Sequence, residues 1–113
     1  SEYAIANAKK EVKKYCRVAN AVDLPFDDNS IDVVISITTL HNLEENDLRI
    51  ALLEIERVAK RGSFITLDAY RDDNEKDRME AWNLTAKTVM RVDQWKEFFA
   101  DVGYSGDYNW FIP

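Results

Sequence analysis

The middle of the chain constrains the fold more than any other part. Residues 31–37 are mostly apolar at both alternating sets of positions, which is typical of a strand buried on both faces of a parallel sheet. Residues 47–61 place apolar side chains along one face of a helix, and Gly62 follows where many helices end in a left-handed residue. Residues 63–67 form a second short strand. The pattern predicts a right-handed βαβ unit with parallel strands over residues 31–68.

Weaker patterns flank this unit on both sides. Apolar spacing and capping residues predict the other elements one by one. In chain order they are a helix over residues 1–14, a very short strand at 17–19, a helix over residues 74–90, a helix that begins at the cap residue Asp93 and ends at Gly103, and a last strand over residues 104–113. Strands and helices that alternate in this way indicate an α/β fold with a mostly parallel sheet.

The composition limits the partners that such a chain can have. With 113 residues, of which 46% are hydrophobic, the chain has the size of one domain with a packed core. A net charge of −6 argues against a nucleic-acid or anionic-membrane partner, and no apolar run approaches the roughly 18 residues of a membrane span. The lone Cys16 cannot form an internal disulfide, so the reducing cytoplasm is the expected location.

Three motifs occur together in the order and spacing of a known family. They read Asn-Ala-x-x-Leu-Pro-Phe-x-Asp-x-Ser-x-Asp-x-Val-x-Ser from Asn20, Leu-His-Asn-Leu from Leu40, and Glu-Ile-x-Arg-Val-x-Lys-x-Gly from Glu54. With them the chain resembles a class I S-adenosylmethionine-dependent methyltransferase, of the broad group that methylates small molecules. The resemblance covers residues 1–70 well and the rest more loosely. It implies a three-layer Rossmann-like sheet and S-adenosylmethionine as the cofactor.

One signature of that family has no counterpart in this sequence. The family carries a glycine-rich loop after its first strand and, at the end of its second, an acidic residue that binds ribose hydroxyls, as in dinucleotide-binding folds. The chain has three glycines, Gly62, Gly103 and Gly106, and none forms such a loop. By the resemblance, residues 1–8 match the helix that follows the acidic strand end. We therefore expect a fold truncated at its N-terminus, either a shortened copy or one whose missing part is supplied elsewhere.

The resemblance also implies which residues hold the cofactor. Asn20 takes the position of a polar residue that contacts the adenine amino group, and the backbone N–H of Ala21 meets an adenine ring nitrogen. An aspartate is commoner at that position, and an asparagine in such a loop can instead cap a turn. Ser36, Ile37 and Leu40 lie at the carboxyl end of the central strand, where open parallel sheets bind ligands, and would line the floor under the methyl donor.

Three residues are candidates for contact with a methyl acceptor. His41 is the only histidine, and a neutral imidazole can act as a general base near pH 7, although it can equally pack at the start of a helix. Tyr70 and Arg71 follow Asp68 at the carboxyl end of the second strand, where they face a small-molecule substrate or are ordinary loop residues. The aspartates at positions 27, 28 and 32 lack the spacing of a calcium loop, and they predict a turn and no metal site.

The sequence leaves functions of different classes open. The first is methyl transfer to a small molecule, weak or absent in this chain by itself because the cofactor loop is missing. The second is a non-catalytic module, because strand 31–37 would present an open apolar edge that recruits another strand. This edge predicts a homodimer or a strand-exchanged oligomer, unless residues 17–19 pair with it inside one chain. A nucleotide-binding domain of another kind is disfavoured, because no phosphate-binding glycine loop occurs.

Overall fold

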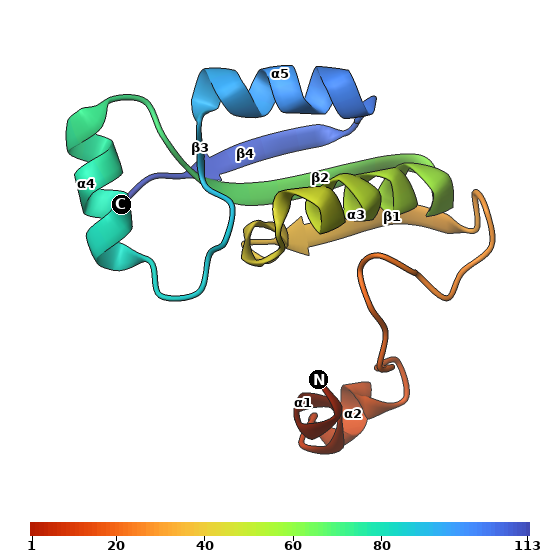
Figure 1. Ribbon diagram of the computed structural model, residues 1–113. Helices are drawn as coiled ribbons and strands as arrows, with labels where there is room; N and C mark the ends of the chain where they lie inside the picture. The colour runs from red at the N-terminus through yellow and green to blue at the C-terminus, as the bar shows by residue number, and fades with distance from the viewer.

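The computed structural model describes all 113 residues, and Figure 1 shows how its elements are arranged. The first 19 residues form an N-terminal arm that projects from the body of the molecule. In chain order the elements are α1 (Glu2–Ala6), α2 (Lys10–Lys13), β1 (Ile31–Ile37), the 3-10 helix η1 (Leu40–Asn42), α3 (Glu45–Val58), β2 (Ala59–Tyr70), α4 (Asp73–Trp82), β3 (Met90–Arg91), α5 (Val92–Val102) and β4 (Asp107–Phe111). None of the helices combines the length and the apolar character needed to cross a membrane.

The predicted strand–helix–strand unit is confirmed, with one correction at the end of its helix. β1 covers the predicted residues and pairs with β2 in parallel. α3 ends at Val58 and the chain enters β2 at once, so the expectation that Gly62 ends the helix is wrong. Ile31 lies opposite Ala59 and Val33 lies opposite Gly62. The residues after Val58 therefore join the ladder with β1 instead of continuing the helix.

β2 lies in the middle of the sheet. β1 and β4 pair with it in parallel, and β3 adds a two-residue parallel pairing at its end. The carboxyl ends of β1, β2 and β4 therefore point to the same edge of the sheet, toward α4 (Figure 1). An edge of this kind is where open α/β sheets bind their ligands.

The core lies between one face of the sheet and the helices α3 and α5, which both cover that face (Figure 1). Trp95 is fully buried there, and its ring stacks on Phe99 with the ring centroids 5.9 Å apart. The buried core residues are Leu40, Leu48, Ala51, Leu52, Ile55, Ile65, Leu67, Ala69, Trp95, Phe98, Phe99 and Tyr104. Burial of these side chains is the main favourable term that holds the body together.

A polar contact inside the core fixes the start of β4. The Tyr104 hydroxyl accepts a hydrogen bond from Ser63 at 3.0 Å and donates one to the carbonyl of Asp107 at 2.9 Å. Burial raises the pKa of Tyr104, so its hydroxyl stays protonated and able to donate. Gly106 passes so close to both side chains that an added Cβ would collide with Ser63 and Tyr104.

The opposite face of the sheet is uncovered along β1. Val33, Ile35 and Ile37 alternate onto this face, and each is more than half exposed, whereas Val34 packs against the core. The expectation that this strand is buried on both faces is therefore wrong for this chain. The reason is that α3 and α5 lie on the same side, while the arm stays away from the sheet (Figure 1). β1 also pairs with β2 alone, so its second edge is open.

The arm differs from the single helix expected over residues 1–14. Two short helices form instead, and neither has a buried residue. The break follows Asn7, whose side-chain amide donates to the carbonyl of Tyr3 at 2.8 Å and so competes with further helical turns. The strand expected at residues 17–19 does not form, and the only pairing nearby is an isolated bridge between Asn20 and Asp23. Helices this short need packing to be stable, and here the body supplies none.

The C-terminal elements differ in length from the apolar pattern: α4 and β4 are shorter than predicted, and α5 begins earlier. α4 ends at Trp82, eight residues before the predicted end, because the side chain of Asn83 accepts the backbone N–H groups of Thr85 and Ala86 and turns the chain. α5 has Arg91 as its cap where Asp93 was expected, since Gln94 accepts the Arg91 N–H. Gly103 ends α5 with a positive φ of 85°, as predicted.

Candidate functional site

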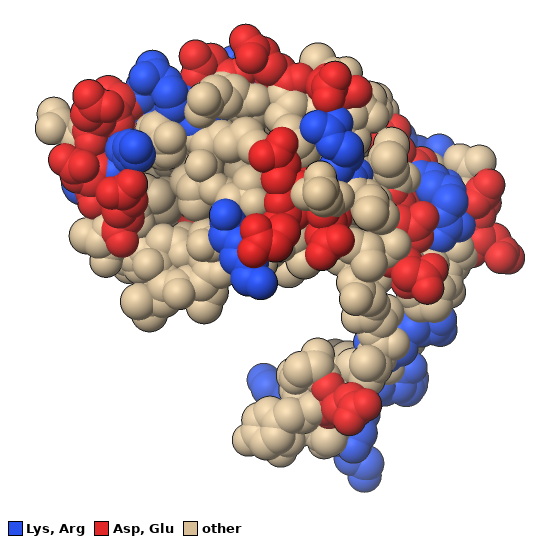
Figure 2. Space-filling view, in the orientation of Figure 1, with Lys and Arg blue, Asp and Glu red and all other residues tan.

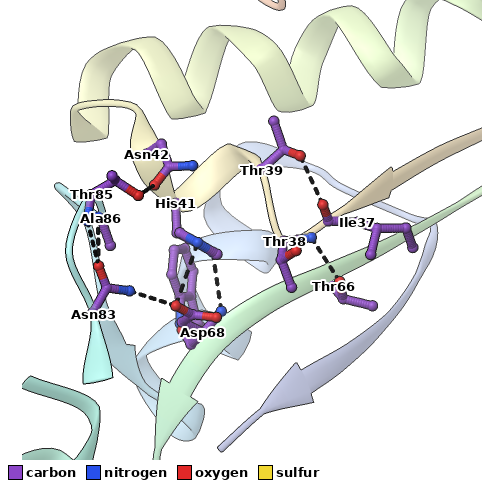
Figure 3. Close-up of polar contacts among 11 residues, drawn as sticks. Ile37, Thr38, Thr39, His41, Asn42, Thr66, Asp68, Asn83, Thr85 and Ala86 are labelled. Atoms are coloured by element: carbon purple, nitrogen blue, oxygen red, sulfur yellow. Dashed lines mark hydrogen bonds and ion pairs between the residues drawn. The ribbon is translucent and has the colours of Figure 1, made fainter. Parts of the chain in front are cut away.

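A buried histidine and a buried aspartate meet where β1 and β2 end (Figure 3). The turn η1 follows β1 and carries His41, while Asp68 lies near the end of β2. The backbone N–H of Asp68 donates to Nδ1 of His41 at 3.2 Å, and Nε2 of His41 lies 3.4 Å from Oδ2 of Asp68. Since Nδ1 accepts, Nε2 carries the ring hydrogen when the imidazole is neutral. Burial lowers the pKa of His41, and the opposing effect of Asp68 is smaller, so the imidazole is neutral at pH 7.

Asn83 and Trp95 complete the surroundings of Asp68. The side-chain amide of Asn83 donates to Oδ2 of Asp68 at 2.6 Å, and Nε2 of His41 lies near the same oxygen (Figure 3). The indole N–H of Trp95 donates to the backbone carbonyl of Asp68 at 3.1 Å. The other carboxylate oxygen, Oδ1, accepts no hydrogen bond from the protein, and no fully enclosed side-chain nitrogen or oxygen lacks a partner. Oδ1 therefore reaches the space outside.

The segment after α4 is fastened to the turn that carries His41. The N–H groups of Lys87 and Thr88 donate to the carbonyl of His41 at 2.9 and 3.0 Å. The hydroxyl of Thr85 donates to the side chain of Asn42 at 2.9 Å (Figure 3). These bonds hold the turn and residues 83–88 together as one wall around Asp68.

A cavity of about 580 Å³ opens beside this group of residues. Its polar lining comes from the ends of the strands and from the segment after α4, and its apolar lining comes from two aromatic rings and a leucine. The lining residues are Thr38, His41, Asn42, Asp68, Trp82, Asn83, Leu84, Thr85 and Phe111. The size suits a small organic molecule, for which typical pockets measure about 300–1,000 Å³.

Thr38, at the rim of the cavity, has a strained backbone. Its φ is 45°, which is unusual for a β-branched residue. The N–H of Thr38 donates to both the carbonyl and the hydroxyl of Thr66, at 3.1 and 2.9 Å, which holds this conformation (Figure 3). Such strain costs on the order of 1–3 kcal/mol and is concentrated at functional sites in proteins. It supports the carboxyl end of β1 as part of a ligand site.

The loop with the predicted adenine contacts is clamped to α3. Glu54 accepts the Leu24 N–H at 2.8 Å, and Arg57 donates to the carbonyls of Leu24 and Phe26 at 3.0 and 2.8 Å. The hydrogen bond from Arg57 lowers the pKa of Glu54 to about 2, with help from the Leu24 N–H. Glu54 and Arg57 belong to the third sequence motif, so that motif has a structural role in holding this loop.

Asn20 and Ala21 lie at the start of the clamped loop. The side-chain oxygen of Asn20 accepts the Val22 N–H at 3.1 Å, which is the turn-capping arrangement that the sequence allowed. The backbone N–H of Ala21 has no hydrogen-bond partner in the chain, so it is available to an outside acceptor.

The remaining predicted site residues lie in different surroundings. Ile37 is exposed on the uncovered sheet face and Ser36 is half-buried, whereas Leu40 is only 3% exposed and packs in the core. Tyr70 lines a separate cavity of about 280 Å³ beside α4. Arg71 pairs with Glu75, which raises the pKa of the arginine. Neither residue lines the cavity that contains His41.

The sequence indicates that Asp68 ends a strand but assigns it no role, and no pattern in it points to Asn83. The position of Asp68 beside a carboxyl end was a usable signal, since ligands bind there. No signal could have found Asn83, because its contact with Asp68 joins residues on opposite sides of α4. The chain has no group of three or more His, Cys, Asp or Glu residues placed to hold a metal ion.

Comparison with known proteins gives the class to which this fold and site belong. A family model described as "Methyltransferase domain" matches residues 1–67. A tRNA (carboxymethyluridine(34)-5-O)-methyltransferase from Arabidopsis thaliana is 34% identical over 79 residues, which are 69% of this chain and 19% of that protein. An uncharacterized protein from Haemophilus influenzae is 33% identical over 105 residues, 88% of this chain and 41% of that protein.

The chain therefore belongs to the class I S-adenosylmethionine-dependent methyltransferases, and both the predicted family and the predicted α/β fold with a mostly parallel sheet are confirmed. It spans about a fifth and about two fifths of the lengths of the two relatives that it matches.

Proposed function

We propose that the chain takes part in methyl transfer from S-adenosylmethionine to a small-molecule acceptor. The observation that carries the proposal is the cavity at the carboxyl ends of β1 and β2, with a buried carboxylate open to it, in a chain of the methyltransferase family. S-adenosylmethionine supplies a methyl group on a positively charged sulfur, so the protein has mainly to bind and align the two reactants. One relative is named as a tRNA methyltransferase. That substrate is stated for the longer relative, and we do not assign it to this chain.

The chain's own residues fit one part of the cofactor. The free N–H of Ala21 suits an adenine ring nitrogen. The side-chain oxygen of Asn20 accepts the Val22 N–H and has a second lone pair that can accept a hydrogen bond from the adenine amino group. Ser36 and Ile37 end β1 beside the strained Thr38, and we assign them to the floor under the methyl donor. Leu40 supports that floor from the core, since it is too deeply buried for direct contact.

For this chain by itself we propose weak activity or none. The sequence holds no glycine-rich loop and no ribose-binding acidic residue of the family type. Most of the contacts that bind the cofactor would therefore be supplied from elsewhere. For the methyl acceptor, we propose that His41 acts by positioning Asp68. We propose that Tyr70 and Arg71, which lie outside the cavity, contact the outer part of a larger acceptor. The exposed, unpaired Cys16 fits a reducing cytoplasm, where we propose that the protein works.

Isothermal titration calorimetry with S-adenosylhomocysteine, the demethylated product, tests the cofactor proposal without knowledge of the acceptor. We expect measurable binding that Asn20→Leu weakens. Asn46→Leu is the matched control, because Asn46 is exposed on α3 and far from the loop in sequence. Absence of heat at two temperatures, or equal binding by the Asn20 and Asn46 variants, would remove the adenine assignment.

A second candidate function is a non-catalytic module that self-associates, and the open edge of β1 favours it. Bare apolar edges pair readily with another strand. Exchange of the N-terminal arm between two copies is the alternative route. The arm holds five basic and two acidic residues, whereas residues 20–113 hold ten basic and nineteen acidic ones. Figure 2 shows the basic side chains of the arm and the acidic clusters over the body. The positive arm of one copy is therefore attracted to the negative body of another.

A further inference from the structure

We infer that the cavity beside Asp68 binds a ring-bearing alcohol or amine, whose O–H or N–H hydrogen is accepted by Oδ1 of Asp68. This inference rests on the proposed function, because it names the chemical class of the methyl acceptor. It also assigns Asp68, and not His41, as the residue that touches the acceptor. Three features of the cavity lead to it: the unbalanced charge, the occupied imidazole and the aromatic walls.

The charge of Asp68 has no cationic partner in the protein. Asp68 is only 4% exposed, and no lysine or arginine nitrogen lies within 4.0 Å of its carboxylate. The neutral amide of Asn83 donates to Oδ2, and the neutral imidazole of His41 lies near the same oxygen. A buried carboxylate with a free oxygen is costly unless a further donor binds it. A hydroxyl or an ammonium group entering the cavity supplies that donor, whereas an anion is repelled.

His41 is unable to accept the hydrogen of a ligand. Nδ1 already accepts the N–H of Asp68, and Nε2 of the neutral ring carries a hydrogen, so the ring has no free lone pair. His41 is therefore a positioning residue: its bond to the backbone holds Asp68 at the wall of the cavity, while Asn83 binds Oδ2 and leaves Oδ1 facing the cavity.

The aromatic walls select the body of the ligand. Trp82 and Phe111 lie with their ring centroids 5.5 Å apart and tilted by 42°, and both line the cavity. They are 59% and 37% exposed, so their faces are free to stack on a planar ring. Exposed aromatic faces also attract ammonium groups. An aromatic ring that carries a hydroxymethyl or aminomethyl group satisfies both the walls and the carboxylate.

The proton balance of the transfer follows from this placement. The hydrogen of an alcohol passes to Oδ1 of Asp68 as the oxygen lone pair forms the bond to the methyl carbon, and the carbon–sulfur bond breaks with its electron pair moving to sulfur. An ammonium group first gives one proton to Oδ1, which frees the nitrogen lone pair to form the same bond. The products are the methyl ether or the positively charged methylammonium, the neutral thioether and a neutral carboxylic acid, which later releases its proton to solvent.

Three matched probes test the inference by NMR: benzyl alcohol, benzylamine and phenylacetate. We expect the alcohol and the amine to shift the indole N–H of Trp82 and the ring signals of His41, the only histidine, and phenylacetate to leave both in place. Asp68→Asn keeps an oxygen for Asn83 and His41 but turns the free oxygen into a donor. This variant should weaken the binding of benzylamine by about tenfold or more, as expected for the loss of a hydrogen bond to a charged group. Asp77→Asn, which removes the same charge from an exposed position on α4, should change nothing.

The outcomes separate this inference from the proposed function. Equal binding of phenylacetate and benzylamine, an unchanged affinity in Asp68→Asn, or no binding of any probe would overturn it. Trp82→Ala should weaken the binding of the alcohol and of the amine to the same extent. This variant tests the aromatic walls while Asp68 is unchanged. If the probes bind while S-adenosylhomocysteine does not, the site stands and methyl transfer by this chain fails. If S-adenosylhomocysteine binds and the probes do not, the acceptor class is wrong and the cofactor proposal stands.

Discussion

A hydrogen bond between Asp68 and His41 fixes which ring nitrogen of the neutral imidazole carries the hydrogen. The Asp68 backbone N–H donates to Nδ1 of the imidazole, and Nε2 lies 3.4 Å from Oδ2 of the same aspartate. The backbone of Asp68 therefore binds one ring nitrogen, and its carboxylate lies near the other. The arrangement requires a neutral imidazole with its hydrogen on Nε2, and it has consequences that can be measured in the isolated protein.

The first prediction concerns the protonation of His41. Its pKa should lie below 6.5, because burial disfavours the imidazolium more than Asp68 favours it. With a single histidine in the chain, ¹⁵N NMR reports its tautomer and its titration without assignment by mutation. We expect signals of the Nε2–H tautomer at pH 7. A pKa above 6.5 would mean that the carboxylate dominates and that the pair is ionic.

The same shift links stability to pH. Between the lowered pKa and 6.5 the unfolded chain binds more protons than the folded one, so the free energy of unfolding should fall as the pH drops through this window. Urea unfolding at a series of pH values measures the slope, and His41→Gln should flatten it. An unchanged slope in the variant would place the effect on other groups.

The second prediction concerns the clamp between α3 and the loop of residues 20–30. Glu54 has a pKa of about 2, well below its ordinary value of 4.5, because Arg57 and the Leu24 N–H bind its charged form. The stabilisation is present above pH 4.5 and is lost as the pH falls toward 2. Glu54→Gln should abolish this acid-dependent loss and speed amide exchange at Leu24. Glu45→Gln, an exposed change at the start of the same helix, is the control.

Much of the body could be predicted because its signals are local. The bounds of β1 and the centre of α3 follow from side-chain periodicity, and the end of α5 follows from Gly103. The pattern fails where a distant strand or a side-chain turn overrides periodicity. Gly62 joined β2 because β1 offered a ladder, and α4 ended early because Asn83 turned the chain.

The candidate site was less predictable than the fold. His41 was identified by its chemistry and its place after a strand, but its bond to Asp68 joins residues 27 positions apart. The role expected for it also changes, since a neutral imidazole whose Nδ1 already accepts a hydrogen bond has no free lone pair for the proton of a ligand. Tyr70 and Arg71 follow the same strand end, yet their side chains line other surfaces. Periodicity gives the strand end but not the direction of each side chain.

The third prediction compares two tryptophans. Trp95 is fully buried, stacks on Phe99 and donates to the carbonyl of Asp68, so Trp95→Ala should cost about 3–5 kcal/mol of unfolding free energy. Trp82 is 59% exposed and has Phe111 as its aromatic partner, so Trp82→Ala should cost less than about 1.5 kcal/mol. Urea unfolding followed by circular dichroism measures both. Equal losses would contradict the assignment of the core.

The last prediction tests self-association. Ile35 is 65% exposed at the centre of the open strand β1, so a lysine there should block pairing with a second copy. In sedimentation equilibrium we expect the wild-type chain to form dimers and Ile35→Lys to remain monomeric, while Ile50→Lys, on the exposed side of α3, should still dimerise. Added salt separates the two routes, because it weakens exchange of the basic arm but not pairing between apolar edges. A wild-type chain that stays monomeric at all concentrations would exclude both.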